Sequence, residues 1–186
     1  MKEIIRSHLE FSDESYHRMM DIAIEREASK NQLIFHPYKP TSKILFLKKG
    51  LLRGYKLIDG KDYTHHFYTA DWFATDFHSF LTEDPSQIYI TTVEDCVYLE
   101  FQKKDLLNLY RTSHQLEGLG RIIAEKAYLA TVEKLASMQL HSLAEKYELF
   151  IKTSPSLIQR VPQKYIASYL GVSEQSLSRI KQQVIS

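Results

Sequence analysis

The stretch RVPQKYIASYLGVSEQSLSRIK, residues 160–181, determines how the C-terminal part of the chain folds. Pro162 suits the start of a helix, Gly171 permits the positive φ of a tight helix-ending turn, and Ser173 can cap a second helix. The apolar residues that recur at helical spacing are Ile166, Ala167, Leu170, Val172, Leu177 and Ile180. Two short helices packed around a glycine turn are therefore predicted, which is a helix-turn-helix.

The second of these helices carries side chains that suit contact with DNA bases. Arginine pairs bidentately with guanine, glutamine with adenine, and glutamate accepts a hydrogen bond from cytosine. The candidates for base contact are Glu174, Gln175, Ser178 and Arg179. The candidates for phosphate contact, which sets register on the duplex, are Lys164, Ser173 and Ser176. The alternative is that these are two ordinary packed helices at a C-terminus, or a degenerate motif used for protein contacts by a small-molecule sensor.

Charge is distributed unevenly along the chain. The whole chain has a formal net charge of only +1, so any basic surface for nucleic acid must be local. Residues 157–186 contain four basic side chains and one acidic one, a formal charge of +3, and the rest of the chain is therefore net acidic. This asymmetry favours DNA binding by the C-terminal segment.

The first half of the chain has a different pattern, rich in β-branched and aromatic residues between positions 33 and 101. Asp59-Gly60 predicts a tight hairpin turn between strands Leu51–Ile58 and Lys61–Tyr68. Residues 88–101 predict a further pair of strands, and residues 11–27, with Ser12 as cap, predict a helix. Many short strands with regular turns indicate a β-sandwich or barrel.

Helical spacing returns after residue 101. Helices are expected over 102–110, over 115–140 and over 142–152, followed by a connector between Pro155 and Pro162. The middle helix would be ~37 Å long at 1.5 Å per residue, which is longer than a small domain needs. We therefore expect it to form the seam of a homodimer, although simple intrachain packing is the alternative.

These segments together resemble the Crp/Fnr family of transcription regulators. The residues that carry the resemblance are RVPQKYIASYLGVSEQSLSRI (160–180), AEKYELFIKTSPSLIQRVP (144–162) and FLKKGLLRGYKLIDGKDYTHHFYTADWF (46–73). The resemblance implies an α+β chain with a jelly-roll-like β-roll sensor domain (1–113), a dimerisation helix (114–140) and a helix-turn-helix domain (141–186). It also implies a homodimer on double-stranded DNA, with RNA polymerase as a further partner.

The chain departs from the family pattern in two places. Ala74-Thr75 stands where cyclic-AMP-binding members have Gly-Glu, and Gln87-Ile88 stands near the position of their phosphate-binding arginine. No arginine occurs between Arg53 and Arg111, so a buried phosphate would lack its bidentate partner. We expect any small-molecule effector to differ from cyclic AMP and to bind around these four residues. The second departure concerns the β-wing that follows the second helix in the family, which we expect to be absent or minimal.

Other chemistries are less well supported by the sequence. The single cysteine, Cys96, excludes a cysteine-based metal or iron–sulfur site and is interpreted as a small buried hydrophobe. The adjacent His65 and His66 would face opposite sides of a strand, so a metal or haem site is disfavoured. No nucleophile–base pair or glycine-rich phosphate loop is present, and no apolar stretch is long enough to span a membrane. We expect a cytoplasmic protein that is not an enzyme and needs no cofactor.

Overall fold

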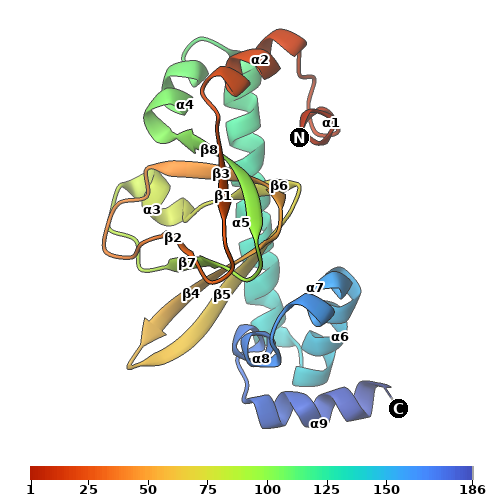
Figure 1. Cartoon of the computed structure of the whole chain (residues 1–186). Coiled ribbons are helices and arrows are strands. Elements are labelled where there is room, and N and C mark those ends of the chain that lie inside the picture. Colours follow the sequence, from red (N-terminus) through yellow and green to blue (C-terminus); the bar gives the residue numbers. More distant parts are fainter. Residues whose placement is uncertain (186) are drawn as a thin grey trace. The chain divides into compact units, whose positions relative to one another are not determined.

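A computed structural model describes residues 1–185 of the chain, with side-chain burial described as far as Gln183 (Figure 1). The described residues form two compact units. The first unit contains Met1–Gly54 and Phe67–Tyr128, and the second contains Tyr55–His66 together with the described residues from Leu129 onward. The two units are described separately below.

The first unit is built around two four-stranded sheets (Figure 1). The first sheet has the order β1 (Ile24–Ala28), β8 (Cys96–Gln102), β3 (Lys43–Lys49), β6 (Trp72–Ala74). The second has the order β2 (Leu33–Phe35), β7 (Tyr89–Thr92), β4 (Leu51–Ile58), β5 (Lys61–Thr69). The ends of β4 and β5 nearest the Asp59-Gly60 turn belong to the second unit. This arrangement confirms the β-sandwich that the alternating sequence predicts.

Strand β8 lies between the two hydrophobic clusters of the first unit. Leu99 and Phe101 point into a cluster that also contains Ile5, Phe46 and residues of the helices. Cys96 and Tyr98 point to the opposite side and pack with residues of both sheets. Successive side chains of a strand face opposite ways, so one strand contributes to two cores.

Four helices and the start of a fifth complete the first unit. They are α1 (Lys2–Arg6), α2 (Asp13–Asp21), α3 (Phe77–Thr82), α4 (Lys103–Tyr110) and the first half of α5 (His114–Leu140). Leu116, Leu119 and Ile123 of α5 are buried in the first cluster. The helix predicted over 115–140 is thus confirmed, as is the short helix before it.

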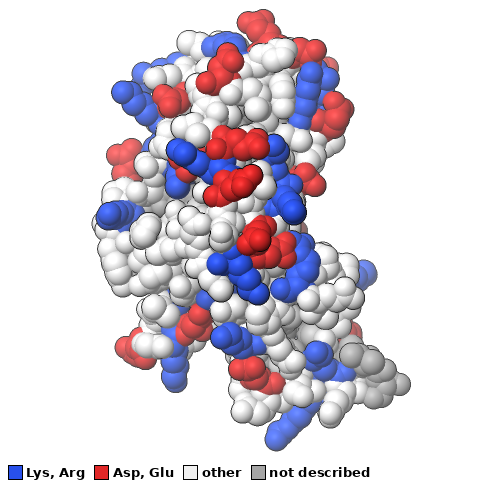
Figure 2. Space-filling model, in the orientation of Figure 1, with Lys and Arg blue, Asp and Glu red and all other residues white. Residues whose placement is uncertain are grey.

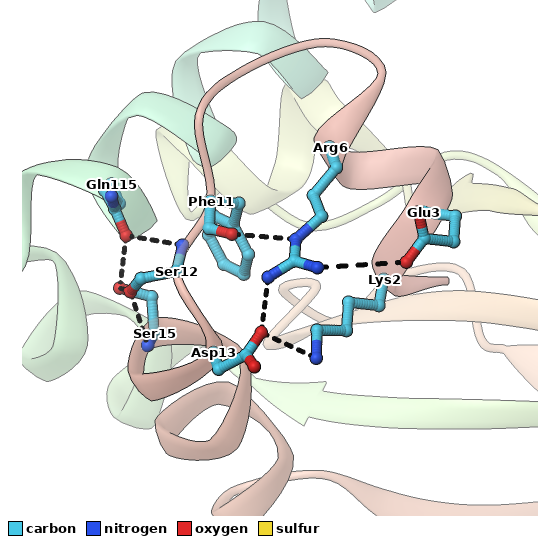
Figure 3. Close-up of polar contacts among 8 residues, drawn as sticks. All are labelled: Lys2, Glu3, Arg6, Phe11, Ser12, Asp13, Ser15 and Gln115. Atoms are coloured by element: carbon cyan, nitrogen blue, oxygen red, sulfur yellow. Dashed lines mark hydrogen bonds and ion pairs between the residues drawn. The ribbon is translucent and has the colours of Figure 1, made fainter.

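A network of polar contacts fastens α2 to α1 and to α5 (Figure 3). Lys2 Nζ lies 2.7 Å from an Asp13 carboxylate oxygen, which also pairs with the Arg6 guanidinium. The Lys2 hydrogen bond, the Lys2 charge and the Arg6 contacts lower the pKa of the Asp13 carboxyl. On the other side of α2, Gln115 Oε1 accepts hydrogen bonds from the Ser12 amide (3.0 Å) and the Ser15 hydroxyl (2.7 Å). The N-terminal residues are therefore an integral layer of the first unit.

The prediction of one helix over residues 11–27 is wrong in its second part. Ser12 caps α2 as expected, since its hydroxyl accepts a hydrogen bond from the Ser15 amide, but the helix ends at Asp21. Residues Ile24–Ala28 instead form β1, which pairs antiparallel with β8 from Ile24 opposite Glu100 to Ala28 opposite Cys96. A ladder with a distant strand has overridden the local helical preference.

The strands in the region 88–101 are present but belong to different sheets. β7 pairs with β2 and lies in the second sheet, whereas β8 pairs with β1 and β3 in the first. The turn between them, which contains Glu94 and Asp95, therefore carries the chain from one sheet to the other.

The second unit consists mostly of helices. After the second half of α5 come α6 (Leu143–Thr153), α7 (Pro155–Arg160), α8 (Gln163–Leu170) and α9 (Glu174–Ile185). α6 begins with a capping box in which Ser142 and Glu145 bond each other's backbone amides. The predicted connector between Pro155 and Pro162 contains α7, which starts at a proline whose missing amide would have had no partner there. Among the described helices, none has the combination of length and apolar character needed to cross a bilayer.

Gly50 occupies a position that only glycine can fill. Its φ is +106°, and an added Cβ would lie 2.4 Å from Cys96 Sγ. We expect Gly50→Ala to lower the free energy of unfolding by about 3 kcal/mol, because backbone strain and overpacking combine. Gly60→Ala is the matched control: φ is +73° but nothing lies within 4 Å, so a loss of about 1 kcal/mol is expected. Urea unfolding of both variants measures the difference, and equal losses would contradict the packing argument.

Candidate nucleic-acid interface and effector region

A left-handed glycine joins α8 to α9. Gly171 has a φ of +74° and caps α8, and the next amide, that of Val172, donates to the carbonyl of Ala167 at 3.0 Å. Ser173 then begins α9, since its hydroxyl accepts a hydrogen bond from the Ser176 amide at 3.2 Å and lies 3.0 Å from the Ser176 hydroxyl. The two helices and the turn that the sequence predicts around Gly171 are present.

Apolar residues hold this α8–α9 pair together and attach it to α6. On α8 the buried residues are Ile166, Ala167 and Leu170, and on α9 Leu177 is buried. Tyr147 and Phe150 of α6 are also buried, and the Phe150 ring lies 5.6 Å from that of Tyr169. Burying side chains of this size supplies about 1.5–3 kcal/mol each, so α6, α8 and α9 stabilise one another.

Opposite this core, α9 presents its polar residues to solvent. The residues expected to contact bases are all exposed: Glu174, Gln175, Ser178 and Arg179. Of those expected to contact phosphates, Lys164 and Ser173 are exposed and Ser176 is partly buried. The Lys164 ammonium lies 5.0 Å from the centre of the neighbouring Tyr165 ring. The folded chain therefore leaves these side chains accessible to a partner.

Basic and acidic side chains are interspersed over the face of the molecule shown in Figure 2, without an extended patch of one sign. This matches the formal net charge of +1 for the chain. This face therefore offers no broad surface of one charge that would attract a polyanion.

The four residues of the expected effector region lie in the first unit but differ in exposure. Ala74, Thr75 and Ile88 are buried, whereas Gln87 is exposed. The Thr75 hydroxyl donates to the Lys43 carbonyl at 2.9 Å, and the Thr75 carbonyl accepts from the Tyr68 hydroxyl at 3.1 Å. Both the side chain and the backbone carbonyl of Thr75 are thus hydrogen-bonded to other residues of the protein.

A buried aspartate that the sequence analysis missed lies next to this region. Asp76 caps α3, accepting a hydrogen bond from the Ser79 amide at 3.4 Å, and its second carboxylate oxygen accepts one from the Ser86 hydroxyl at 2.6 Å. Ser79 in turn accepts from the Thr41 amide and donates to the Asp84 carbonyl. An aspartate just before a helical segment is an ordinary capping signal, but the bond of Asp76 to Ser86 could not be found from spacing.

The Asp76 carboxylate makes the surroundings unfavourable for a second negative charge. Burial, and in addition the charge of Asp76, raises the pKa of the Tyr68 hydroxyl, so this group is a neutral donor under ordinary conditions. An anion placed here would face a buried carboxylate, which is costly without a compensating cation. The chemistry of the region suits a neutral or cationic group better than a phosphate.

The histidines and the cysteine do not form a metal site in the described part of the chain, where no group of three or more His, Cys, Asp or Glu side chains could hold an ion. Cys96 is buried, as expected, and its thiol points toward the Glu94 carbonyl at 3.2 Å. Burial of the ring, with smaller contributions from His65 and Lys134, lowers the pKa of His66 to about 4. His66 is therefore neutral at physiological pH.

Comparisons with known proteins support the fold of both halves. The family model described as "Cyclic nucleotide-binding domain" matches residues 25–113. No curated protein matches the sequence. Among solved structures, the c-di-GMP-responsive global regulator CLP of Xanthomonas campestris is 15% identical, with a TM-score of 0.74 over 93% of this chain and 91% of that one.

Two further structures show the same similarity. FixK2 of Bradyrhizobium japonicum is 18% identical, with a TM-score of 0.73 over 88% of this chain and 84% of that one. A protein of Eubacterium rectale assigned to the Crp/Fnr family is 15% identical, with a TM-score of 0.72 over 93% of this chain and 83% of that one. At these identities the similarity shows the fold. Residues 25–113 thus match the family of cyclic nucleotide-binding domains, and the structural neighbours of the chain include a protein assigned to the Crp/Fnr family.

Proposed function

We propose that this protein is a sequence-specific DNA-binding transcription regulator that acts as a homodimer. A small-molecule effector other than cyclic AMP, bound by the first unit, would control it. RNA polymerase is a further partner under this proposal. The proposal assigns no enzymatic activity to the chain.

The observation that carries the proposal is the exposure of one side of α9. Leu177 is buried against α8 and α6, while Gln175, Ser178 and Arg179 around it are exposed. A recognition helix needs this division, because its apolar side must hold it in the motif while its polar side enters the major groove. Glutamine and arginine are the side chains that read adenine and guanine there.

The capping contacts support a role at the DNA backbone. Ser173 and Ser176 bond each other at the first turn of α9, where the helix dipole is positive. Hydroxyl groups and helix N-termini contact phosphate oxygens and fix the register of a protein on a duplex. Lys164 on α8 adds a charge that a phosphate can pair with.

Exposed apolar residues of α5 support dimerisation. Tyr128, Val132 and Leu135 are exposed and recur at spacings of four and three residues, along one side of the helix. A single chain would not expose such a stripe without a partner, since solvent contact of large apolar side chains is unfavourable. A second copy packed through the same helix would bury it, and a two-fold dimer suits two half-sites on DNA.

The surroundings of Asp76 suit an effector that carries a neutral or cationic group. The candidate region is Ala74, Thr75, Gln87 and Ile88, and Asp76 is a charged group next to Thr75. A ligand that binds there better in one arrangement of the protein than in another would shift the population of the DNA-binding state.

Arg179→Ala tests DNA recognition. We expect the affinity for the preferred duplex to fall by about fivefold to 150-fold, the equivalent of ~1–3 kcal/mol for one bidentate base contact. The preferred duplex comes from selection on random sequence, and affinities are compared at one salt concentration because salt changes them all. Lys152→Ala is the matched control, since it also removes an exposed cation of the second unit but lies outside the α8–α9 pair. Equal losses in both variants would contradict base contact by Arg179.

Failure of the wild-type protein to bind any duplex, even at low salt, would contradict the proposed function. That outcome would favour the other candidate, in which the α8–α9 pair binds a protein and the first unit senses a small molecule.

Leu135→Glu tests the dimer. We expect a wild-type dimer to become a monomer at micromolar concentration, because a buried unpaired carboxylate at a seam is costly. Sedimentation velocity measures the change. Glu133→Gln, an exposed polar residue on the same helix, should leave the dimer intact. A wild-type monomer at all concentrations, or a Leu135→Glu dimer, would show that this stripe is not the seam.

Cyclic AMP tests the assignment of the effector class. We expect isothermal titration of the wild-type protein with cyclic AMP to give no saturable heat, because the site offers a carboxylate and lacks the arginine. A saturable titration with a Kd below about 10 µM would contradict this, since it needs about 7 kcal/mol of binding free energy.

A further inference from the structure

The tip of the β4–β5 hairpin packs with the helices of the second unit. Residues Tyr55–His66 include the Asp59-Gly60 turn and the halves of both strands beside it, and they belong to the second unit. The bases of the same two strands belong to the first unit. We call Tyr55–His66 the hairpin tip. It is the segment through which the sheet of the first unit continues directly into the second.

Ser168 of α8 fastens the hairpin tip from one side. Its hydroxyl accepts a hydrogen bond from the Thr64 amide at 2.8 Å and donates one to the Asp62 carbonyl at 2.9 Å. Thr64 itself is buried. One serine hydroxyl thus accepts from an amide and donates to a carbonyl of the same strand, as the backbone of a neighbouring strand would.

Lys134 of α5 fastens the hairpin tip from another side. Its ammonium donates to the His65 carbonyl and lies 4.2 Å from the centre of the Tyr169 ring on α8. Burial lowers the pKa of Lys134 to about 8 and is also the main cause of the lowered pKa of His66. The lysine therefore links α5, α8 and the hairpin tip in surroundings largely removed from water.

Ser168, which contacts the hairpin tip, lies on the same side of α8 as Lys164, the proposed phosphate contact. Lys164 and Ser168 are four residues apart, which places them on the same side of the helix one turn from each other. Under the proposed function, Lys164 contacts a phosphate, and the first helix of the motif crosses the DNA backbone. The hairpin tip therefore sits beside the surface that a duplex would approach.

We propose that the hairpin tip is an autoinhibitory restraint on the α8–α9 pair, with Ser168 as its principal attachment point. While docked, the tip holds α8 and occupies space next to Lys164. Undocking frees α8 and raises the affinity for DNA. Because β4 begins and β5 ends in the first unit, a change in that unit can pull on the tip through the two strands. The inhibitory role rests on the proposed function, whereas the docking itself does not.

Hydrogen–deuterium exchange of the full chain without DNA tests the docking. In Ser168→Ala the docked–undocked equilibrium should shift by about fivefold to thirtyfold, the effect of losing one or two hydrogen bonds. We expect faster exchange in peptides covering 55–66 and 163–170. The matched control is Ser156→Ala, an exposed serine of α7 in the same unit, which should exchange like the wild type. Unchanged exchange of residues 55–66 in Ser168→Ala would overturn the docking role.

DNA affinity tests the inhibitory role. Ser168→Ala should bind the selected duplex about threefold to tenfold more tightly than wild type and Ser156→Ala. Lys134→Gln, which removes the second attachment, should act in the same direction, and circular dichroism checks that both variants fold. Faster exchange combined with unchanged or weaker binding would overturn the inhibitory role. If the wild type binds no duplex, the proposed function and this role fail together, while exchange still decides whether the tip docks.

Discussion

Strand β8 is the element on which the first unit depends. It pairs with β1 on one side and β3 on the other, and its alternating side chains enter both hydrophobic clusters. At its start, Cys96 packs so closely on Gly50 that position 50 cannot carry a side chain. Near its end, Glu100 is buried with Lys43 2.7 Å away and with the Gln102 amide on its other oxygen. A buried carboxylate is tolerable only with such partners, so the register of β3 on β8 is specified by charge as well as by packing.

The sequence predicts well what is determined by neighbours along the chain. The turn at Gly171, the cap at Ser173, the hairpin at Asp59-Gly60 and the long helix depend on residues within a few positions of one another, and the structure has each of them. Strand β1 shows the limit. Residues 24–28 continue a pattern that suits α2, and only the ladder with β8, about seventy residues away, makes them a strand. Contacts of that separation leave no periodic signal in the sequence.

Of the two candidate sites, one could be predicted from neighbours along the chain and the other could not. The exposed side of α9 follows from helical spacing alone, because burying Leu177 places Gln175, Ser178 and Arg179 outward. The effector region does not follow from spacing. The absence of arginine could be seen in the sequence. The bond between Asp76 and Ser86, and the bonds of Thr75 to Lys43 and Tyr68, arise where segments that are separate in the sequence meet. Likewise, nothing local indicates that Ser168 would bond the strand at Asp62 and Thr64.

The satisfied polar groups of the effector region constrain how a ligand could act. Among the described residues, no buried side-chain nitrogen or oxygen lacks a hydrogen-bond partner. A ligand that bonds to Asp76, Ser79 or Ser86 must therefore replace an existing bond, and each replacement releases one of the segments that these residues join: the start of α3, the Thr41 loop or the loop before β7. Exchanging one hydrogen bond for another changes little free energy, so the gain in binding must come from the rest of the ligand. Binding of a polar ligand at Asp76 would thus be coupled to movement of these loops, because the groups that would recognise the ligand are the same groups that hold the loops in place.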